Sequence, residues 1–440
     1  MKHLTFLTIL FAALFVAGCN LLTPQPDEDD YQLSDSPRTQ ARSVKRGVSY
    51  GFSMPDVDMA LLGGSTSWFY NWSSNISTQV DALATQNKMD FFPMAWTGNF
   101  NAAQIRAYKQ SHPGCGYILG FNEPNLTDQC NMTPSQAATP WLSLQALAQE
   151  LNMKLVSPAM NYGTLANYSD PIKWLDEFFT LVPLDKIDVI AVHCYMGGAG
   201  SVKSYIERFK KYGKPIWLTE FCAWETFISS AAAQMQYMSE TITYLEASPD
   251  VERYAWFIPR SAGSVDSYPY MQLLTKTQPY DLTSVGKVFT QMTTLDKKVY
   301  ALADQRIEAE HFTSCRTEEL LTNGGSWETP VHFSPSSEAD DATLQISDFK
   351  TGQWLEYQIE LTAKATYLLQ IRHANYYDVT LALSVDGTTV NELQLPKTGD
   401  FAVWNTSSFP VVLTEGKHVL RLLSKKGTLS MNWLLVTKST

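Results

Sequence analysis

Short apolar runs alternate with longer segments of helical spacing between residues 46 and 260. The apolar runs suit buried strands, and the segments between them carry apolar residues at three- and four-residue steps, as amphipathic helices do. Eight strands are predicted, at 47–52, 66–71, 90–96, 117–122, 154–160, 188–195, 215–221 and 253–259. Helices are predicted at 77–88, 140–152, 204–213 and 230–248, with a closing helix at 283–292.

This alternation predicts that residues 46–295 form an α/β TIM barrel, the (β/α)8 fold, in which eight strands are each followed by a helix. A doubly wound open sheet is the alternative. Such a sheet normally has a glycine-rich nucleotide-binding turn after its first strand. The stretch "GVSYGFSMPD" (47–56) has no such turn, so the barrel is favoured.

The pattern changes at about residue 301. Runs such as "GQWLEYQIEL" and "VTLALSVDG" alternate apolar and polar residues, as half-buried strands do. Turn dipeptides, Asp386-Gly387 and Glu415-Gly416, separate such runs. We therefore expect an all-β sandwich of the jelly-roll kind at 303–440, after a linker at 296–302.

The N-terminus is interpreted as a targeting segment rather than as part of the fold. An apolar run ends in "VAGC", which resembles the bacterial lipobox. The resemblance implies a signal peptide at 1–18 and a lipid anchor on Cys19. Residues 19–45, which are rich in polar residues and proline, are expected to form a flexible tether. We expect an outer-membrane lipoprotein that faces the cell surface or the periplasm; an ordinary secretory peptide is the alternative.

Composition narrows the expected partners. The net charge of -11 argues against nucleic acid, because phosphate would be repelled. Most of the 12 Trp and 21 Tyr residues are expected in the core, but some could be platforms for flat, uncharged ligands such as sugars. We expect a monomer whose partner is a polysaccharide or oligosaccharide.

Five cysteines follow Cys19, and their spacing does not resemble a zinc site. Export would permit disulfides, and a bridge between Cys115 and Cys130 could pin the loop after the fourth predicted strand. The odd number leaves at least one free thiol, which we expect to be Cys315.

Two glutamates end predicted strands: Glu123 follows the fourth strand, and Glu220 lies in the seventh. Strand ends meet at one face of a (β/α)8 barrel, so the two carboxyl groups could face each other there. A carboxyl pair about 5 Å apart can hydrolyse a glycosidic bond with retention. Glu123 would then be the acid/base and Glu220 the nucleophile. A helix cap or an ion pair is the structural alternative for each.

Residues near these glutamates could complete a sugar site. Asn122 could hydrogen-bond the sugar hydroxyl beside the reacting carbon, and Tyr195 could hydrogen-bond Glu220. His193 could line the site or be structural. The candidate platforms are Trp256, as the floor of the site, and Trp96 and Trp72 as outer platforms, with core packing as the alternative for all three.

The motifs "GFNEPN", "WLTEF", "AVHCY" and "YAWF", together with "FYNW" at 69–72, resemble the clan A retaining glycosidases. Within that clan the chain most resembles glycoside hydrolase family 128, which comprises β-1,3-glucanases. The resemblance implies that Glu123 is the acid/base, that Glu220 is the nucleophile and that catalysis needs no cofactor. Hydrolysis of another β-glycan, or glycan capture without catalysis, remains an alternative.

The C-terminal segment, with "RIEAEHF" (306–312) and "MNWLLV" (431–436), resembles a family 6 carbohydrate-binding module. The resemblance implies a structural calcium held by Glu308 and Glu310, with Asn432 in place of the family's later acidic ligand. It also implies sugar stacking on Trp404, which Tyr376 could face. A domain that only packs on the barrel is the alternative.

Overall fold

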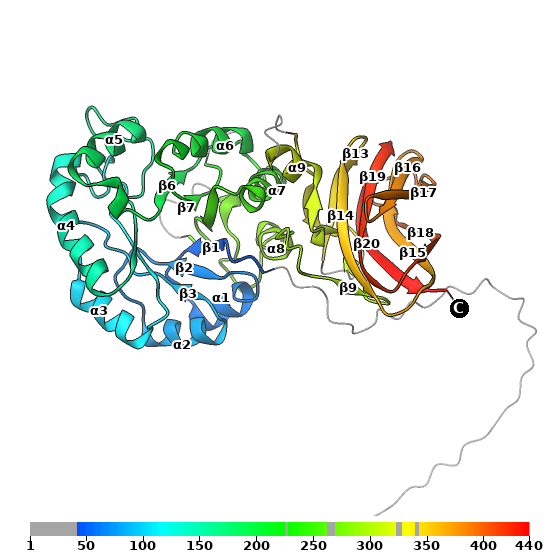
Figure 1. The fold of residues 1–440 in the computed structure, drawn as a ribbon, viewed down its shortest axis with the longest axis horizontal. Helices are drawn as coiled ribbons and strands as arrows, with labels where there is room; N and C mark the ends of the chain where they lie inside the picture. The colour runs from blue at the N-terminus through cyan, green and yellow to red at the C-terminus, as the bar shows by residue number, and fades with distance from the viewer. Residues whose placement is uncertain (1–41, 225–227, 262–268, 323–327, 339–342, 440) are drawn as a thin grey trace, which may run out of the picture. The chain divides into compact units, whose positions relative to one another are not determined.

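The structure is a computed structural model that describes residues 42–224, 228–261, 269–322, 328–338 and 343–439 (Figure 1). The predicted signal peptide, Cys19 and most of the predicted tether lie outside these residues. Within the described part of the chain, no helix combines the length and the apolar character that a membrane span requires.

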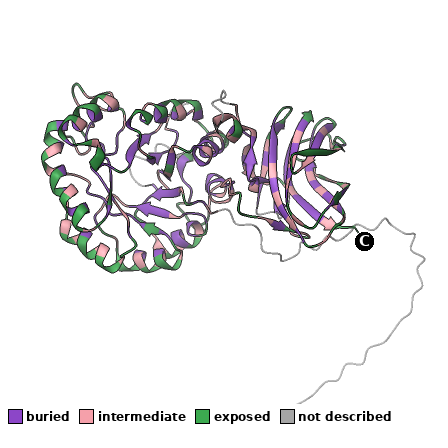
Figure 2. Cartoon of the chain, viewed as in Figure 1, coloured by how far each residue is buried: buried purple, intermediate pink, exposed green. Residues whose placement is uncertain are grey.

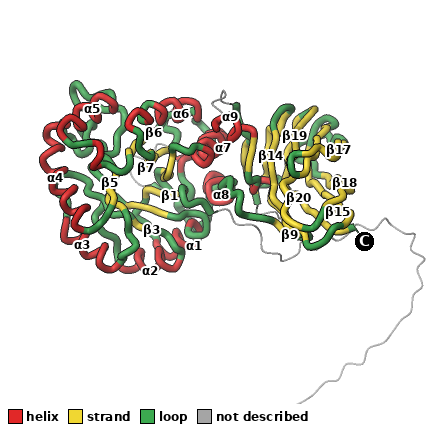
Figure 3. Tube along the Cα trace, in the orientation of Figure 1, coloured by secondary structure: helices red, strands yellow, loops and turns green. Residues whose placement is uncertain are grey.

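Parallel strands form a barrel-like N-terminal domain. One sheet has the order β3-β2-β1-β8-β7-β6, and β4 pairs with β5. Single bridges extend the pairing from Met94 to Leu119 and from Val156 to Val189. Helices lie on the outside of these strands (Figures 1 and 3). The strands are β1 (Arg46–Ser49), β2 (Trp68–Tyr70), β3 (Asp90–Phe91), β4 (Tyr117–Leu119), β5 (Lys154–Val156), β6 (Ile190–Cys194), β7 (Ile216–Phe221) and β8 (Val251–Trp256).

Side-chain caps fix where several helices begin. At α4, the Thr133 hydroxyl accepts a hydrogen bond from the Gln136 backbone, and the Gln136 side chain accepts one from the Thr133 backbone. This capping box starts α4 at Pro134 rather than at the predicted residue 140. The helices are α1 (Pro55–Leu62), α2 (Thr78–Gln86), α3 (Ala102–Ser111), α4 (Pro134–Glu150), α5 (Pro171–Leu181), α6 (Ala199–Glu207), α7 (Ala231–Ala247) and α8 (Ser284–Gln291).

A buried ion pair ties the first strand to the end of this domain. Arg46 is fully buried, and its Nη2 lies 3.4 Å from Glu246 Oε1 in α7. Its guanidinium also donates to the carbonyl oxygens of Phe289 (2.8 Å) and Thr293 (2.9 Å), beside α8. Tyr254 in β8 donates its hydroxyl to the same Glu246 oxygen. The Arg46 charge is therefore paired only inside the protein among the described residues, and losing it should cost stability.

The C-terminal region consists mostly of antiparallel strands in two sheets, with the orders β12-β13-β20-β15-β18 and β11-β14-β19-β16-β17. Alternating strand residues are buried (Figure 2), as the pattern predicts. Asp386 (φ 49°) and Gly387 (φ 81°) form the predicted turn between β16 and β17, where two positive φ angles favour Asp-Gly. Single short elements are β9 (Ala301–Leu302), β10 (Ile307–Glu308), β11 (Ser314–Cys315) and α9 (Arg316–Thr322). The other strands are β12 (His332–Pro335), β13 (Leu344–Lys350), β14 (Trp354–Leu361), β15 (Ala365–Ala374), β16 (Val379–Val385), β17 (Thr388–Leu395), β18 (Asn405–Leu413), β19 (Gly416–Lys426) and β20 (Thr428–Lys438).

The cysteines correct one expectation. Cys115 and Cys130 are both free, so the bridge considered for the loop after β4 is not formed. The Cys115 thiol instead lies 3.6 Å from the carbonyl oxygen of Phe91. Burial raises the pKa of Cys115 and of Cys130 to about 11, which keeps both thiols protonated and unreactive at neutral pH.

Candidate active site

The two candidate glutamates meet at the carboxyl ends of the strands. Glu220 is in β7, and Glu123 follows β4 in a left-handed backbone conformation (φ 45°) that non-glycine residues rarely adopt. Both side chains are almost fully buried. One oxygen of each carboxyl group and a ring nitrogen of His193 all lie within 4.8 Å of one another. This separation suits the carboxyl pair of a retaining glycosidase and is too short for that of an inverting one.

Glu220 accepts hydrogen bonds from three side chains. Its Oε1 accepts from the Trp72 indole nitrogen (2.7 Å) and the Tyr70 hydroxyl (2.8 Å), and its Oε2 accepts from the Tyr195 hydroxyl. An indole N–H can only donate, and three donors converging on two oxygens favour the ionised carboxylate. Glu220 is therefore arranged as an anion whose oxygens are fixed toward the cavity, as a nucleophile requires.

Glu123 is arranged differently. Its Oε1 accepts a hydrogen bond from the Asn161 amide (3.0 Å) and lies 2.9 Å from His193 Nδ1. Its Oε2 has no hydrogen-bond partner among the described residues. Glu123 lines the cavity, so this oxygen is available to a ligand there. A carboxyl oxygen that is open to the cavity can hold a proton and deliver it to a leaving group. This asymmetry in partners is what the predicted roles require, with Glu123 as the acid and Glu220 as the nucleophile.

His193 lies beneath both glutamates and is fully buried. Its Nδ1 is 3.4 Å from Glu220 Oε2 as well as 2.9 Å from Glu123. Burial opposes a charge on this ring, but the two carboxylates outweigh burial and raise the pKa of His193. The Glu123–His193–Glu220 cluster also has the geometry to hold a metal ion, which is the competing structural interpretation of these three residues.

His193 should influence the pH dependence of the reaction through Glu220. Burial raises the pKa of Glu220 and the charge of Glu123 adds to this, whereas a cationic His193 lowers it. If Glu220 is the nucleophile, as predicted, it must be ionised to attack, so kcat/KM should fall as pH drops through this pKa. His193→Asn removes the cation and is expected to move that acidic limb to higher pH. A pH profile of kcat/KM tests this, and His112→Asn is the control for a partly exposed histidine. An acidic limb at the native pH or at lower pH in His193→Asn would contradict the prediction.

A cavity of about 530 Å³ opens above the two glutamates. Aromatic rings form one wall: Phe257 packs edge-on against Trp72 (5.8 Å between ring centroids), Tyr195 (5.7 Å) and Trp224 (5.5 Å). Amide and acidic side chains line another part, near Glu123. The described lining residues are Trp72, Trp96, Asn122, Glu123, Leu126, Asp128, Gln129, Asn161, Tyr195, Glu220, Trp224, Phe257 and Ile258.

Most of the predicted neighbours of the glutamates lie at this cavity. Trp72, Trp96 and Tyr195 line it, and so does Asn122, whose amide nitrogen donates to Gln129 Oε1 (3.2 Å). The Asn122 side-chain oxygen is buried without a hydrogen-bond partner among the described residues, so it can accept one from a ligand. His193 is not among the described lining residues, but its Nδ1 contacts both Glu123 and Glu220.

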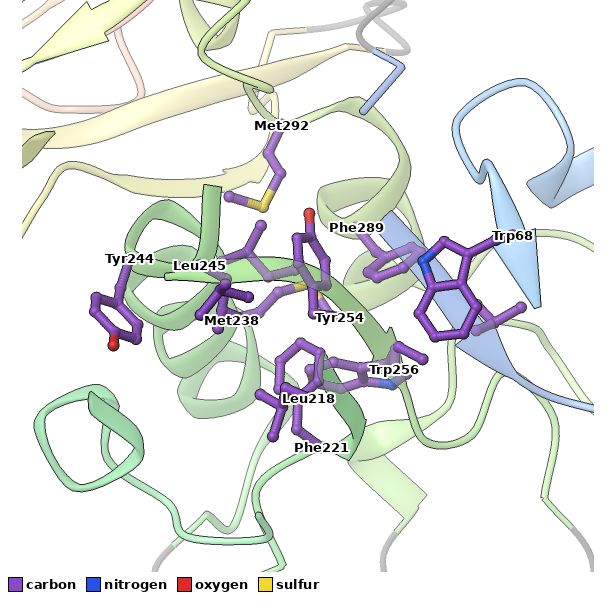
Figure 4. Close-up of a cluster of buried hydrophobic side chains, with 14 of the residues drawn as sticks. Trp68, Leu218, Phe221, Met238, Tyr244, Leu245, Tyr254, Trp256, Phe289 and Met292 are labelled. Atoms are coloured by element: carbon purple, nitrogen blue, oxygen red, sulfur yellow. The ribbon is translucent and has the colours of Figure 1, made fainter. Parts of the chain in front are cut away.

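Trp256 corrects the prediction that it forms the floor of the site. It is fully buried in the hydrophobic core, where it packs against Phe221 and Phe289 (Figure 4), and its indole nitrogen donates to the Met271 carbonyl (2.7 Å). Trp256 is the last residue of β8 and points into the core, whereas Phe257, the first residue after the strand, lines the cavity. The prediction was wrong by one residue.

Among the site residues that were not singled out from the sequence, four contact the two glutamates or form the aromatic wall: Tyr70, Asn161, Trp224 and Phe257. Each lies near the carboxyl end of a strand. Tyr70 ends β2, Phe257 and Trp224 follow β8 and β7 by one and three residues, and Asn161 follows the bridge that extends β5 at Met160. That position was the available signal. The sequence indicates only that Tyr70 belongs to a strand. It does not reveal the hydrogen bond from the Tyr70 hydroxyl to Glu220, because Glu220 lies in a strand far away in the sequence.

The residues considered for calcium are buried close together in the C-terminal domain. Glu310 Oε1 accepts from the Leu344 backbone (3.1 Å), and Asn432 Oδ1 accepts from the hydroxyl of Thr343 (3.4 Å). Arg306 donates to Glu308 Oε2 (2.9 Å). Burial, with the charge of Glu308, raises the pKa of Glu310 well above its ordinary value. Glu310 Oε2 is buried without a hydrogen-bond partner among the described residues.

The residues considered for sugar stacking in this domain are on loops. Tyr376 is 51% exposed, and Trp404 is half-buried, with its indole nitrogen donating to Ser337 (3.0 Å). The buried Asn375 accepts backbone hydrogen bonds from Thr398 (2.9 Å) and Gly399 (3.1 Å), so the loop that contains Tyr376 is tied to the loop that precedes Trp404.

Comparisons with known proteins agree with this geometry. The family model described as "Glycosyl hydrolase catalytic core" matches residues 47–289, and that of "Carbohydrate binding module (family 6)" matches residues 325–438. The crystal structure of a family 128 (subgroup II) endo-β-1,3-glucanase from Pseudomonas viridiflava is similar, with 39% identity and a TM-score of 0.52. That similarity covers 57% of this chain and 98% of the other.

A second solved structure, of a family 128 (subgroup II) endo-β-1,3-glucanase from Sorangium cellulosum, is 32% identical and has a TM-score of 0.50. It covers 56% of this chain and 97% of the other. Among curated proteins, Alkali-sensitive linkage protein 1 of Schizosaccharomyces pombe is 28% identical over 233 residues, which are 49% of this chain and 39% of that protein. The chain thus spans less than half of the length of that relative.

Proposed function

We propose that this chain, which belongs to the glycosyl hydrolase catalytic core family and within it to glycoside hydrolase family 128, hydrolyses β-1,3-glucan with retention of configuration. The observation that carries the proposal is the carboxyl pair of Glu123 and Glu220, with oxygens within 4.8 Å at the base of a 530 Å³ cavity. The two similar solved structures are endo-β-1,3-glucanases, which supports this linkage and an endo mode of action.

The reaction follows from the two arrangements of partners. The Glu220 carboxylate attacks the anomeric carbon and forms a glycosyl ester, while Glu123 gives its proton to the glycosidic oxygen, and the leaving sugar departs. Glu123, now a carboxylate, then takes a proton from a water molecule that attacks the same carbon. The sugar leaves Glu220, and both side chains return to their starting states. Apart from the substrate and this water molecule, the reacting groups are side chains of the chain itself.

The cavity walls suit a neutral glucan. Aromatic faces can pack against the apolar faces of sugar rings, and Asn122 offers an unsatisfied oxygen beside Glu123. We propose that Trp72, Trp96 and Phe257 contact glucosyl rings and that Asn122 binds a hydroxyl beside the reacting carbon. We also propose that the eight strands close into a complete (β/α)8 barrel and that the C-terminal domain is a jelly-roll sandwich.

A panel of polysaccharides tests the function. Mass spectrometry of products should show laminarioligosaccharides of several lengths from laminarin and curdlan, and little release from mannan or β-1,4-glucan. Release from a β-1,4-linked or mixed-linkage glycan alone would support the alternative substrate. Binding of laminarin without any product would support glycan capture instead. Activity that is lost with a chelator and restored by a metal would favour the metal interpretation of the Glu123 cluster.

For the C-terminal domain we propose sugar binding by Trp404 and Tyr376, and one calcium ion held by Glu308, Glu310 and Asn432. The donor set is all oxygen, as calcium prefers, and Glu310 has a buried oxygen that lacks a partner among the described residues. Arg306 forms an ion pair with Glu308, so Glu310 carries the negative charge that is left for the ion to meet.

Calcium is expected to raise the melting temperature of the full chain, and less so at acidic pH because Glu310 must lose its proton to bind the ion. Differential scanning calorimetry with calcium or magnesium, on the native chain and on Glu310→Gln, tests this. Equal melting temperatures with calcium and with a chelator would argue against the site.

We further propose that the protein is a bacterial lipoprotein of the outer membrane, anchored through acylated Cys19. The support is the sequence "VAGC" after an apolar run. Metabolic labelling with a fatty acid analogue tests this, because Cys19→Ser should abolish labelling and release the protein from the membrane fraction. Labelling that persists in Cys19→Ser would contradict it.

A further inference from the structure

The cavity carries more negative charge than the two-glutamate mechanism uses. Three of its described lining residues are acidic, and none is basic. Glu123 and Glu220 take part in the reaction, whereas Asp128 has no part in it. Asp128 is exposed, and no described side chain forms an ion pair or a hydrogen bond with its carboxylate. Its charge is therefore presented to whatever enters the cavity.

The loop that carries Asp128 is held firmly beside the acid. Asp128 lies in the β4–α4 loop, five residues after Glu123. Within this loop the Leu126 backbone donates to the Glu123 carbonyl (3.0 Å), and the Met132 backbone donates to the Pro124 carbonyl (2.8 Å). These bonds fix the position of the Asp128 segment relative to Glu123.

The same loop is also tied to the next one. The Thr127 backbone donates to Thr164 Oγ1 (2.9 Å), in the loop between β5 and α5. Because Glu123 delivers its proton to the leaving oxygen, the loop that follows Glu123 borders the part of the cavity that receives the leaving sugar. The aromatic wall borders the other part of the cavity, beside Glu220, because two of its members, Trp72 and Tyr195, donate hydrogen bonds to Glu220. The other two members are Trp224 and Phe257.

We infer that Asp128 is a specificity-determining residue that excludes anionic groups from the sugar on the leaving-group side. This inference rests on the proposed function and narrows it to uncharged β-glucans. A carboxymethyl, uronate or sulfate group near Asp128 would meet a like charge that no cation among the described lining residues offsets. The repulsion acts in a partly exposed cavity, so dissolved salt should screen it. An uncharged glucosyl ring meets no such penalty.

The test compares laminarin with carboxymethylated curdlan, a β-1,3-glucan that carries carboxylates. The measured quantity is the ratio of kcat/KM on carboxymethylated curdlan to kcat/KM on laminarin. In Asp128→Asn at low salt this ratio should rise about three- to tenfold, the effect of removing one nearby charge in a partly aqueous setting. At high salt the difference between the variant and the native enzyme should shrink.

Two variants serve as controls. Asp128→Glu keeps the charge and should keep the native ratio. Asp185→Asn removes an exposed charge on the connection between α5 and β6, and should leave both activities and the ratio unchanged. The products give an independent measure, since the new non-reducing ends come from the sugar on the leaving-group side. Mass spectrometry should find carboxymethyl groups on these ends more often with Asp128→Asn.

The outcomes separate this inference from the proposed function. Native enzyme that fails to hydrolyse laminarin overturns the proposed function. Native enzyme that hydrolyses laminarin, with a ratio that Asp128→Asn does not raise, overturns the inference alone. A ratio that rises equally at low and high salt, or equally in Asp128→Glu, also overturns it, because the effect would then not be one of charge.

Discussion

Replacing Glu220 with glutamine is expected to lower kcat on laminarin by about 10⁴-fold or more, as loss of an enzymatic nucleophile does. The amide cannot form the glycosyl ester, although it is nearly the same size as the carboxyl. It also removes at least one of the three hydrogen bonds from Tyr70, Trp72 and Tyr195, because the NH₂ group that replaces one oxygen cannot accept. Steady-state release of reducing ends measures the effect.

Glu123→Gln should also lose activity, but for a different reason that added azide can reveal. With an activated aryl glycoside the leaving group needs no proton, so Glu123→Ala should still form the ester, and azide should give a β-glycosyl azide. Azide in Glu220→Ala should attack directly and give the α-glycosyl azide. An α-glycosyl azide from Glu123→Ala and a β-glycosyl azide from Glu220→Ala would show that the two roles are the reverse of those proposed. Glu207→Gln, an exposed change on α6, should keep native activity.

Arg46→Met is expected to destabilise the barrel-like domain by about 3–5 kcal/mol, the usual cost of leaving one partner of a buried ion pair without the other. The change leaves Glu246 buried in α7 without its cation and removes the donors to the carbonyl oxygens of Phe289 and Thr293. Urea unfolding followed by tryptophan fluorescence measures the loss.

An exposed pair provides the matched control. Arg106 and Glu150 form an ion pair in which both side chains are about half exposed, so Arg106→Met should cost much less stability than Arg46→Met. The double variant Arg46→Met/Glu246→Met should recover part of the loss, because no uncompensated charge remains. A cost for Arg46→Met no larger than that for Arg106→Met would show that the buried pair does not hold the ends of the domain together.

The arrangement of elements could be predicted because each strand is a short apolar run and each helix shows its own spacing. The residues at which the helices and strands begin and end could be predicted less accurately. The helix α4 starts at Pro134 because of the Thr133 capping box, a local signal that an apolar pattern does not contain. The strand β4 ends at Leu119, earlier than its apolar run, and beyond it an isolated bridge, between Asn122 and Ala159, continues the pairing toward the site.

The glutamate pair could be predicted because barrel strands bring their carboxyl ends together, whatever lies between them in sequence. Contacts that depend on side-chain direction could not. The sequence predicts Trp256 at the cavity, but Trp256 is buried in the core. The next residue, Phe257, lines the cavity. Tyr70 and Asn161 bind the two glutamates across 150 and 38 residues of sequence, so only the folded chain reveals them.

The anomer formed first from a laminarioligosaccharide tests the central claim most directly. Proton NMR during rapid hydrolysis should show the β-anomer at the new reducing end before mutarotation produces the α-anomer, because two inversions at one carbon restore its configuration. Initial accumulation of the α-anomer would mean a single displacement by water. It would contradict the assignment of Glu220 as a nucleophile acting with Glu123.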